Sequence, residues 1–280
     1  MSQPAFIQVG ALAEGFAPAS NVLEPIEDLN GRVLQVMLDD DPRQTRVFSF
    51  LAGGLIRAEQ GEYPCRVTSI RPGYYLIDFV DPAGGTDGGT DGGTAGRPRT
   101  TSIVLDEPLG LCTIVTGSLP GENEARLGAF TRVERGLPLT GVVADIRHGR
   151  VVREGARAQA PLHRASDELI GLRNLYDYSA SERYEHIYLN AHFYAWHCLS
   201  GVEAGLADVD RCHTIGIAEK LYLFVWCEKI VPTLGVIMID LERMKTDGKV
   251  LGYEGSNFGA LSNFPVGALA QVLNATRYPR

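Results

Sequence analysis

The chain has 280 residues, of which 45% are hydrophobic and 21% charged, as is ordinary for a globular protein of one large or two modest domains. Its net charge of −8 leaves no basic footprint, so we expect no nucleic-acid partner. No apolar run approaches the ~20 residues of a membrane span, and the N-terminus lacks the pattern of a signal peptide. Five cysteines without CxxC spacing favour reduced thiols and a cytoplasmic location.

The first half of the chain predicts an irregular arm followed by short strands. Residues 1–27 mix Gly, Pro and Ala and predict the arm. Residues 118–136 indicate a loop with one short ordered piece, and the polar stretch 148–168 separates the two halves. Alternating apolar and polar positions predict strands in this half, at 33–38, 46–50, 65–70, 74–80, 101–105, 111–115 and 142–146.

Residues 84–96 read GGTDGGTDGGTAG and predict a flexible loop, because such a run cannot bury a core. Gly-rich loops can also cradle phosphate. Here no lysine and no strand-to-helix context accompany the glycines, and the aspartates would repel phosphate, so the surface loop is favoured.

The second half begins with a stretch, 169–228, that is dense in Tyr, Trp and His. Its short alternating runs are typical of antiparallel strands with one face toward a core or cavity. Near the C-terminus, apolar residues recur at helical spacing after Pro265, which predicts a helix over 265–276.

The two halves also repeat one another. Cys65 aligns with Cys212, and Asp106 aligns with Asp240, each aspartate ending an aliphatic run. Between these landmarks the first half is longer by thirteen residues, which is the length of the run 84–96. That run therefore has the character of an insertion into one of two similar domains.

Each repeat offers about eight strands and little helix, and a meandering sheet of that size closes into a barrel to remove its edges. We therefore predict a mainly β protein of two tandem lipocalin-like antiparallel barrels with few short helices. The predicted domains are 1–147, which contains the insertion, and 160–280, which carries the ligand site.

Motifs throughout the second half resemble the molybdenum cofactor biosynthesis protein F (MoaF) family, densely over 169–277 and more loosely over 25–145. The resemblance implies a link to molybdopterin metabolism. The motifs are RNLYDY (173–178), ERYEHIYLN (182–190), WHCLSG (196–201), GLAD (205–208), DRCH (210–213), EKIVPTLG (228–235), GYEG (252–255) and NFPVG (263–267).

The spacing Gly171-x4-Tyr176-x-Tyr178 is similar to the opening strand of the phenolic acid decarboxylases. These are cofactor-free lipocalin-like barrels that remove CO2 from hydroxycinnamic acids. The resemblance implies that the two tyrosines grip a substrate and that Glu228 relays a proton. Leu206 stands where the decarboxylases place an arginine, which speaks against decarboxylation itself.

The residues themselves are compatible with these roles, but purely structural roles are left open as alternatives. Tyr176 and Tyr178 lie two apart on a strand, so both hydroxyls share a face and could bind a polar group; they could equally be aromatics in a packed sheet. Glu228 ends an apolar strand, where burial would raise its pKa. The alternative is a solvated glutamate beside Lys229.

Further polar and aromatic residues of this half are candidates for substrate binding. They are Tyr184, His186, Tyr188, Tyr194, His197 and Arg211. The histidines show no spacing that would converge on a metal, so we expect no metal site. Cys212 and Cys227 are more typical of buried small hydrophobes than of nucleophiles.

The favoured function is that of a cofactor-free lyase or isomerase acting on a small aromatic or conjugated molecule by tyrosine and glutamate acid–base chemistry. The alternative is a non-catalytic small-molecule binding protein or scaffold in molybdenum cofactor metabolism. The expected partner is this small molecule, and a homodimer is left open. In the first half, Val36, Leu38 and Asp81 stand at the positions of Tyr176, Tyr178 and Glu228, so we place the site in the second half.

Overall fold

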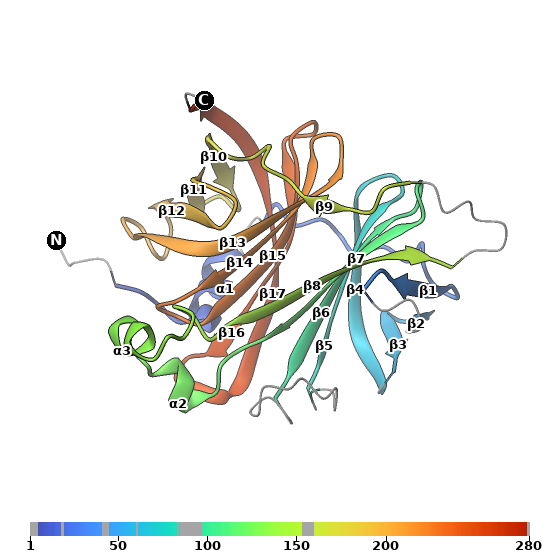
Figure 1. Ribbon diagram of the computed structural model, residues 1–280, viewed down its shortest axis with the longest axis horizontal. Helices are drawn as coiled ribbons and strands as arrows, with labels where there is room; N and C mark the ends of the chain where they lie inside the picture. Colours follow the sequence, from blue (N-terminus) through green and yellow to red (C-terminus); the bar gives the residue numbers. More distant parts are fainter. Residues whose placement is uncertain are drawn as a thin grey trace. The chain divides into compact units, whose positions relative to one another are not determined.

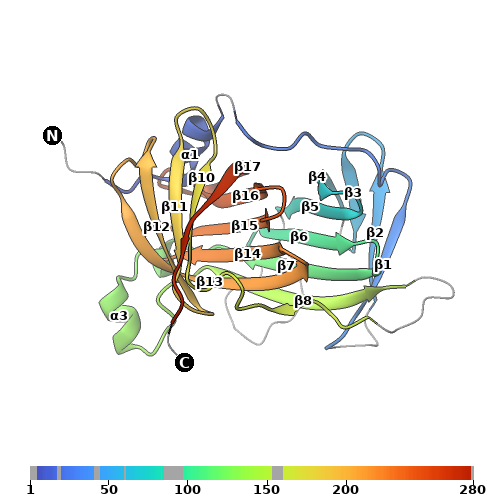
Figure 2. The ribbon, with the colours of Figure 1, turned by 90° about the horizontal axis from the view of Figure 1, so that it is seen from above.

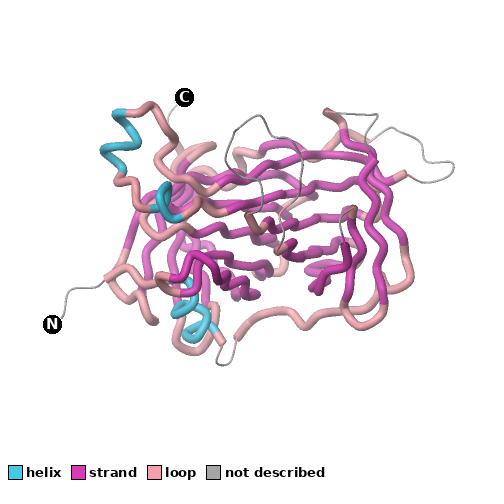
Figure 3. Tube along the Cα trace, turned by 90° about the horizontal axis from the view of Figure 1, so that it is seen from below, coloured by secondary structure: helices cyan, strands magenta, loops and turns pink. Residues whose placement is uncertain are grey.

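The computed structural model of the chain describes residues 5–17, 20–40, 45–59, 61–82, 84, 97–152 and 160–278. Strands make up most of this part, and its helices are few and short (Figure 3). Of the predicted loop 84–96, all residues except Gly84 lie outside the described ones. None of the five cysteines forms a disulfide. Within the described residues, no helix has the length and apolar character needed to cross a membrane.

Two antiparallel β-barrels follow one another along the chain, as the strand pattern predicts (Figure 1). In the first barrel each strand pairs with the next, and the last strand closes the barrel by pairing with the first. Its strands are β1 (Val33–Leu38), β2 (Thr45–Leu51), β3 (Leu55–Ala58), β4 (Gly61–Arg71), β5 (Tyr74–Asp81), β6 (Arg99–Asp106), β7 (Leu111–Ser118) and β8 (Val143–Val151).

The interior of the first barrel is apolar. In β1, Leu34, Val36 and Leu38 are buried while the residues between them are exposed, because alternate side chains of a strand point to opposite faces. These three pack in one core with Phe48 and Phe79. Val36 and Leu38 thus fill the interior positions that tyrosines hold in the second barrel.

The second barrel closes through β12 and β13, which pair with each other in addition to their outer neighbours. A two-residue strand, β9 (Arg164–Ala165), continues the sheet beside β13. The barrel strands are β10 (Leu172–Asp177), β11 (Arg183–Tyr188), β12 (Phe193–Ser200), β13 (Ala207–Ala218), β14 (Leu221–Glu228), β15 (Thr233–Asp240), β16 (Lys245–Glu254) and β17 (Asn257–Ala275).

The internal repeat read from the sequence is present in the fold. The pair β4–β5 shifts register just after Ser69, and the pair β13–β14 shifts just after Gly216, which is the matching position. Cys65 and Cys212 lie at matching positions of β4 and β13. The extra residues of the first half fall in the connection between β5 and β6, as the alignment predicts.

A helix, α1 (Val9–Phe16), stands where the sequence predicts an irregular arm, so that prediction is wrong. Val9 and Leu12 are buried in the core of the second barrel, where α1 packs on β16 and β17 (Figure 2). Gly252 leaves room for this contact, since a Cβ atom there would lie 2.1 Å from Val9. A helix this short is marginal by itself, so its stability comes from tertiary packing that local sequence patterns do not reveal.

Two further helices lie in the stretch for which one short ordered piece is predicted. They are α2 (Glu122–Ala125) and α3 (Ala129–Glu134). The C-terminal helix predicted over 265–276 is wrong, because this stretch belongs to β17, which pairs with both β16 and β10. Val266 and Ala268 are buried while Leu269 is exposed, so the side chains alternate between the two faces as in a strand. Strand pairing that closes the barrel therefore outweighs the helical spacing of the apolar residues.

The chain divides into two compact units, neither of which is continuous in sequence. One unit comprises 1–22, 119–143 and 165–280, and the other comprises 23–118 and 144–164. The second barrel therefore shares its unit with α1, α2 and α3. The predicted domains, 1–147 and 160–280, are each continuous in sequence, whereas these two units exchange segments.

Candidate functional site

The interior of the second barrel is lined from alternate positions of neighbouring strands. Tyr176 in β10 lies opposite Tyr184 in β11, and His186 in β11 lies opposite Trp196 in β12. Inward positions of paired strands face each other. Runs that are separate in sequence thus build one aromatic wall.

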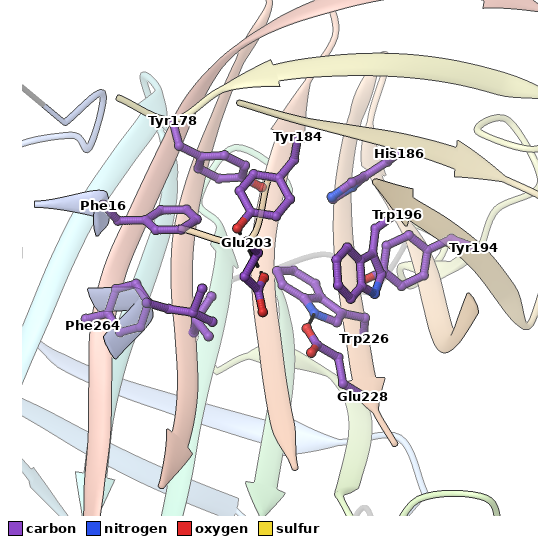
Figure 4. Close-up of a pocket in the computed structure, with 12 residues that line it drawn as sticks. Phe16, Tyr178, Tyr184, His186, Tyr194, Trp196, Glu203, Trp226, Glu228 and Phe264 are labelled. Atoms are coloured by element: carbon purple, nitrogen blue, oxygen red, sulfur yellow. Dashed lines mark hydrogen bonds between the residues drawn. The ribbon is translucent and has the colours of Figure 1, made fainter. Parts of the chain in front are cut away.

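A cavity of about 50 Å³ lies within this wall (Figure 4). One water needs about 10–15 Å³ of such space, so the cavity has room for roughly four waters or one small organic molecule. Its lining residues come from α1, from the strands and from two connections between strands, which hold Tyr178 and Glu203. They are Leu12, Phe16, Tyr178, Tyr184, His186, Tyr194, Trp196, Glu203, Trp226, Glu228, Val250 and Phe264.

The two tyrosines predicted to act together are in different situations. The Tyr176 hydroxyl lies 2.8 Å from the Tyr188 hydroxyl and accepts a hydrogen bond from Asn174 Nδ2 at 3.0 Å. Burial raises the pKa of Tyr176 to about 12. Tyr178 lines the cavity, and its hydroxyl has no hydrogen-bond partner among the described residues. Tyr178 is therefore available to a ligand, whereas Tyr176 and Tyr188 are engaged with each other.

Glu228 lies at the end of β14 and faces the cavity, where Trp226 Nε1 donates a 2.8 Å hydrogen bond to its Oε1. Burial, and secondly the charge of Asp210, raise its pKa to about 8, so the carboxyl group is largely protonated at neutral pH. Lys229 does not neutralise it, since the Lys229 ammonium pairs with Asp208 at 2.6 Å and with Asp210 at 3.4 Å.

A second carboxyl group, that of Glu203, also faces the cavity (Figure 4). Glu203 lies in the turn between β12 and β13 and is buried. The Tyr184 hydroxyl donates a 3.2 Å hydrogen bond to its Oε2, and burial raises its pKa. Sequence reasoning missed Glu203 because a turn residue carries no strand periodicity to show which way it points.

His186 is buried at the cavity wall, and its Nδ1 has no hydrogen-bond partner among the described residues. Burial lowers the pKa of its imidazole to about 3, so the ring is neutral at physiological pH. A neutral, unpartnered ring nitrogen at a cavity is a group that a ligand or a water can satisfy.

Three of the predicted substrate-binding residues do not line the cavity, and one of them is Tyr188, whose hydroxyl pairs with that of Tyr176. His197 lies on the outer face of β12, where its Nδ1 is 3.9 Å from Glu185. Arg211 is exposed on β13, between the inward Asp210 and Cys212. Leu206 is buried among the apolar side chains of the interior. The structure thus brings Tyr178, Tyr184, His186, Tyr194 and Glu228 together and leaves His197 and Arg211 outside.

The cysteines and histidines offer neither an activated thiol nor a metal cluster. Burial raises the pKa values of Cys212 and Cys227 to about 12, whereas a reactive cysteine needs a lowered value. Across the described residues, no group of three or more His, Cys, Asp and Glu side chains is placed to hold a metal ion.

Several lining residues were not predicted. Trp196 and Trp226 lie in runs that the sequence marks as strands, and period-two alternation from Tyr194 and Glu228 would have pointed both inward. Leu12 and Phe16 could not be found this way, because they reach the cavity through the packing of α1.

Two family models match the chain, that of the MoaF N-terminal domain over residues 4–120 and that of the MoaF C-terminal domain over residues 163–276. Protein MoaF of Klebsiella aerogenes is 46% identical over 280 residues, which cover 99% of this chain and 98% of that protein. A solved structure of a candidate beta-lactamase from Burkholderia vietnamiensis matches 39% of this chain and 99% of its own with a TM-score of 0.33 and 13% identity, a likeness too weak to support an argument.

Proposed function

This chain belongs to the MoaF family, and we propose that its C-terminal barrel binds a small molecule in the cavity lined by α1. The observation that carries this proposal is an unsatisfied polar atom in the wall of that cavity. His186 Nδ1 is buried and has no hydrogen-bond partner among the described residues. Buried polar groups are costly without hydrogen bonds, so a bound molecule that supplies them is stabilised there.

The size of the cavity limits the ligand. With α1 in place, the cavity of about 50 Å³ is smaller than the roughly 150 Å³ that holds a benzene ring, so a molecule of one ring fits only when Leu12 and Phe16 shift. A role in molybdenum cofactor metabolism is the setting that the family resemblance implies. A pterin-sized ligand would enter this barrel only if Leu12 and Phe16 moved away with α1.

Acid–base catalysis is the second candidate function, and the protonation state of Glu228 favours it. With a pKa of about 8, its carboxyl group can give up a proton near neutral pH. The neutral imidazole of His186 lines the same cavity, where it can orient a substrate through a hydrogen bond. A lyase or isomerase that moves a proton on a small conjugated molecule would use Glu228 both to donate the proton and to take it back.

Tryptophan fluorescence tests the binding proposal, because the chain contains two tryptophans and both line the cavity. We would titrate the protein with single-ring compounds that are neutral, cationic or anionic. At least one should give a saturable change in emission. The change should be lost in Val250→Phe, which fills the cavity, and kept in His197→Ala, which alters the outer face.

If no compound gives a saturable change, or if Val250→Phe with unchanged circular dichroism responds like the wild type, the cavity is not the binding site.

A further inference from the structure

The cavity contains two carboxyl groups and no basic side chain. Glu203 and Glu228 both line it, and none of its described lining residues is a lysine or an arginine. Two basic residues that adjoin lining residues in sequence are engaged elsewhere. Lys229, next to Glu228, pairs with Asp208, and Arg183, next to Tyr184, pairs with Asp177. An anionic ligand would therefore meet acids and no counter-charge.

The remaining walls are aromatic. Seven of the lining side chains carry an aromatic ring of Phe, Tyr or Trp: Phe16, Tyr178, Tyr184, Tyr194, Trp196, Trp226 and Phe264. The face of such a ring attracts a cation, and rings that converge around a small space recognise organic ammonium groups. Figure 4 shows these rings around the same space into which Glu203 and Glu228 project.

The polar groups of the cavity are suited to a ligand that donates hydrogen bonds. A neutral imidazole nitrogen without a partner, Nδ1 of His186, belongs to a side chain that is only 4% exposed. The carboxyl groups of Glu203 and Glu228 can also accept hydrogen bonds from such a ligand once Glu228 is ionised. An ammonium group supplies up to three N–H donors and a positive charge at one end of a small molecule.

From these observations we infer that the ligand of the C-terminal barrel is a small organic cation, a primary ammonium carried on an apolar body of about one ring. The inference rests on the proposed binding function. The ammonium group lies against Glu228 and Glu203, and the body of the molecule packs between Trp226 and Phe16. An inorganic cation does not fit the role, because no cluster of metal-ligating side chains is present in the described residues.

Binding of a cation also displaces a proton. A positive charge within ~4–6 Å favours the ionised carboxylate, whereas burial and the charge of Asp210 raise the pKa of Glu228 to about 8 before binding. The O–H bond of Glu228 breaks as the ammonium binds, and the proton passes to the buffer. The complex then holds an ammonium–carboxylate pair, with no other change in covalent bonds.

Three compounds with one ring and different charge test the inference. At pH 7 benzylamine is a cation, benzyl alcohol is neutral and benzoate is an anion. Calorimetric titration of the full chain should show benzylamine binding at least about tenfold more tightly than the other two, the factor expected from ~1.4 kcal/mol of charge recognition. Titration in buffers of different ionisation enthalpy should show proton release with benzylamine alone.

The variant Glu228→Gln removes the ionisable group and keeps the shape of the side chain. It should reduce the preference for benzylamine over benzyl alcohol and abolish the proton release. Binding of benzyl alcohol or benzoate as tight as that of benzylamine would overturn the cation assignment while the binding function stood. Absence of binding by all three would overturn the binding function and the assignment together. His197→Ala is the matched control and should leave all three affinities unchanged.

Discussion

The substitutions Tyr176→Phe and Tyr178→Phe form a matched pair, because each removes one hydroxyl group and keeps the ring. Tyr176→Phe should lower the free energy of unfolding by about 1–3 kcal/mol, because Tyr188 and Asn174 each lose a buried hydrogen-bond partner. Tyr178→Phe should leave stability almost unchanged, since its hydroxyl has no partner among the described residues, and should instead weaken ligand binding. Thermal denaturation followed by circular dichroism measures the stability of both variants. Equal losses of stability in the two variants would contradict the different roles assigned to them.

Protonation of Glu228 makes a prediction about pH. The folded-state pKa of about 8 lies above that of an unfolded glutamate. The folded chain therefore binds more protons between these values, and the contribution of this group to stability is present at low pH and lost as pH rises through 8. Glu228→Gln should be more stable than the wild type at pH 8.5 by at least about 1 kcal/mol, and the difference should vanish near pH 4.

The control for this pH dependence is Glu134→Gln, which changes an exposed carboxyl group of α3. It should melt like the wild type at every pH. A stability difference for Glu228→Gln that is the same at pH 4 and pH 8.5 would mean that Glu228 does not carry a buried proton.

At the residue scale, sequence reasoning identified the lining where strand parity and a resemblance agreed. Tyr178 follows β10 and lies two residues after Tyr176, Tyr184 lies in β11, and Glu228 ends β14 two residues after Trp226. The prediction for His197 and Arg211 rests on side-chain chemistry alone, and His197 points to the opposite face of β12 from Tyr194 and Trp196. Glu203 could not be chosen, because the path of a turn is set by the strands that it connects.

Among the strands, β15 approaches β14 closely enough to shape the site. Gly235 lies opposite Trp226, and a Cβ atom at Gly235 would lie 2.1 Å from the Trp226 ring. Gly235→Ala should therefore displace this ring, lengthen its hydrogen bond to Glu228 and lower the melting temperature. Gly259→Ala in β17 is the control, since its Cβ atom would meet only the Asn257 side chain, at 3.2 Å.

The measurement for Gly235→Ala is the near-ultraviolet circular dichroism of the tryptophans together with the melting temperature. If both stay at the wild-type values while Gly259→Ala behaves the same way, the close packing of β15 on Trp226 is not a constraint on the site.

At the element scale, the sequence predicted most strands and missed elements whose form depends on distant packing. The strands β5 and β14 stand out because their apolar runs are long and bounded by turns. The helical spacing after Pro265 was misleading, since a residue pattern of this length fits either period until the pairing of β17 with β10 and β16 is known. The helix α1 was missed for the same reason, because its apolar face is complete only against the barrel.

For the whole molecule, the repeat predicts that the insertion 84–96 is dispensable. The matching connection in the second barrel, between β14 and β15, needs only residues 229–232. Strands of equal length in the first barrel can therefore be joined after the insertion is removed. Since loop length changes closure entropy by only ~0.6 kcal/mol per doubling, the deletion variant should melt within a few degrees of the wild type. A loss of folding would show that the run is packed and that the repeat alignment is wrong.

The fold class, the repeat and the family could be predicted from the sequence because each depends on local patterns or motifs. The division into compact units was not, because residues 1–22 and 119–143 join the second barrel across long sequence separations. A fragment of 160–280 would lack α1 and with it Leu12 and Phe16 of the cavity wall. Binding experiments on this protein therefore need the full chain.

The claim that the cavity of the C-terminal barrel is the ligand site is tested most directly by a crystal structure of the full chain soaked with benzylamine. We predict electron density for the compound among Phe16, Trp226 and Glu228, with its nitrogen within hydrogen-bond distance of a carboxylate oxygen of Glu228. Density only at the outer face of β11 to β13, near His197, or an unchanged cavity at saturating benzylamine, would contradict the account.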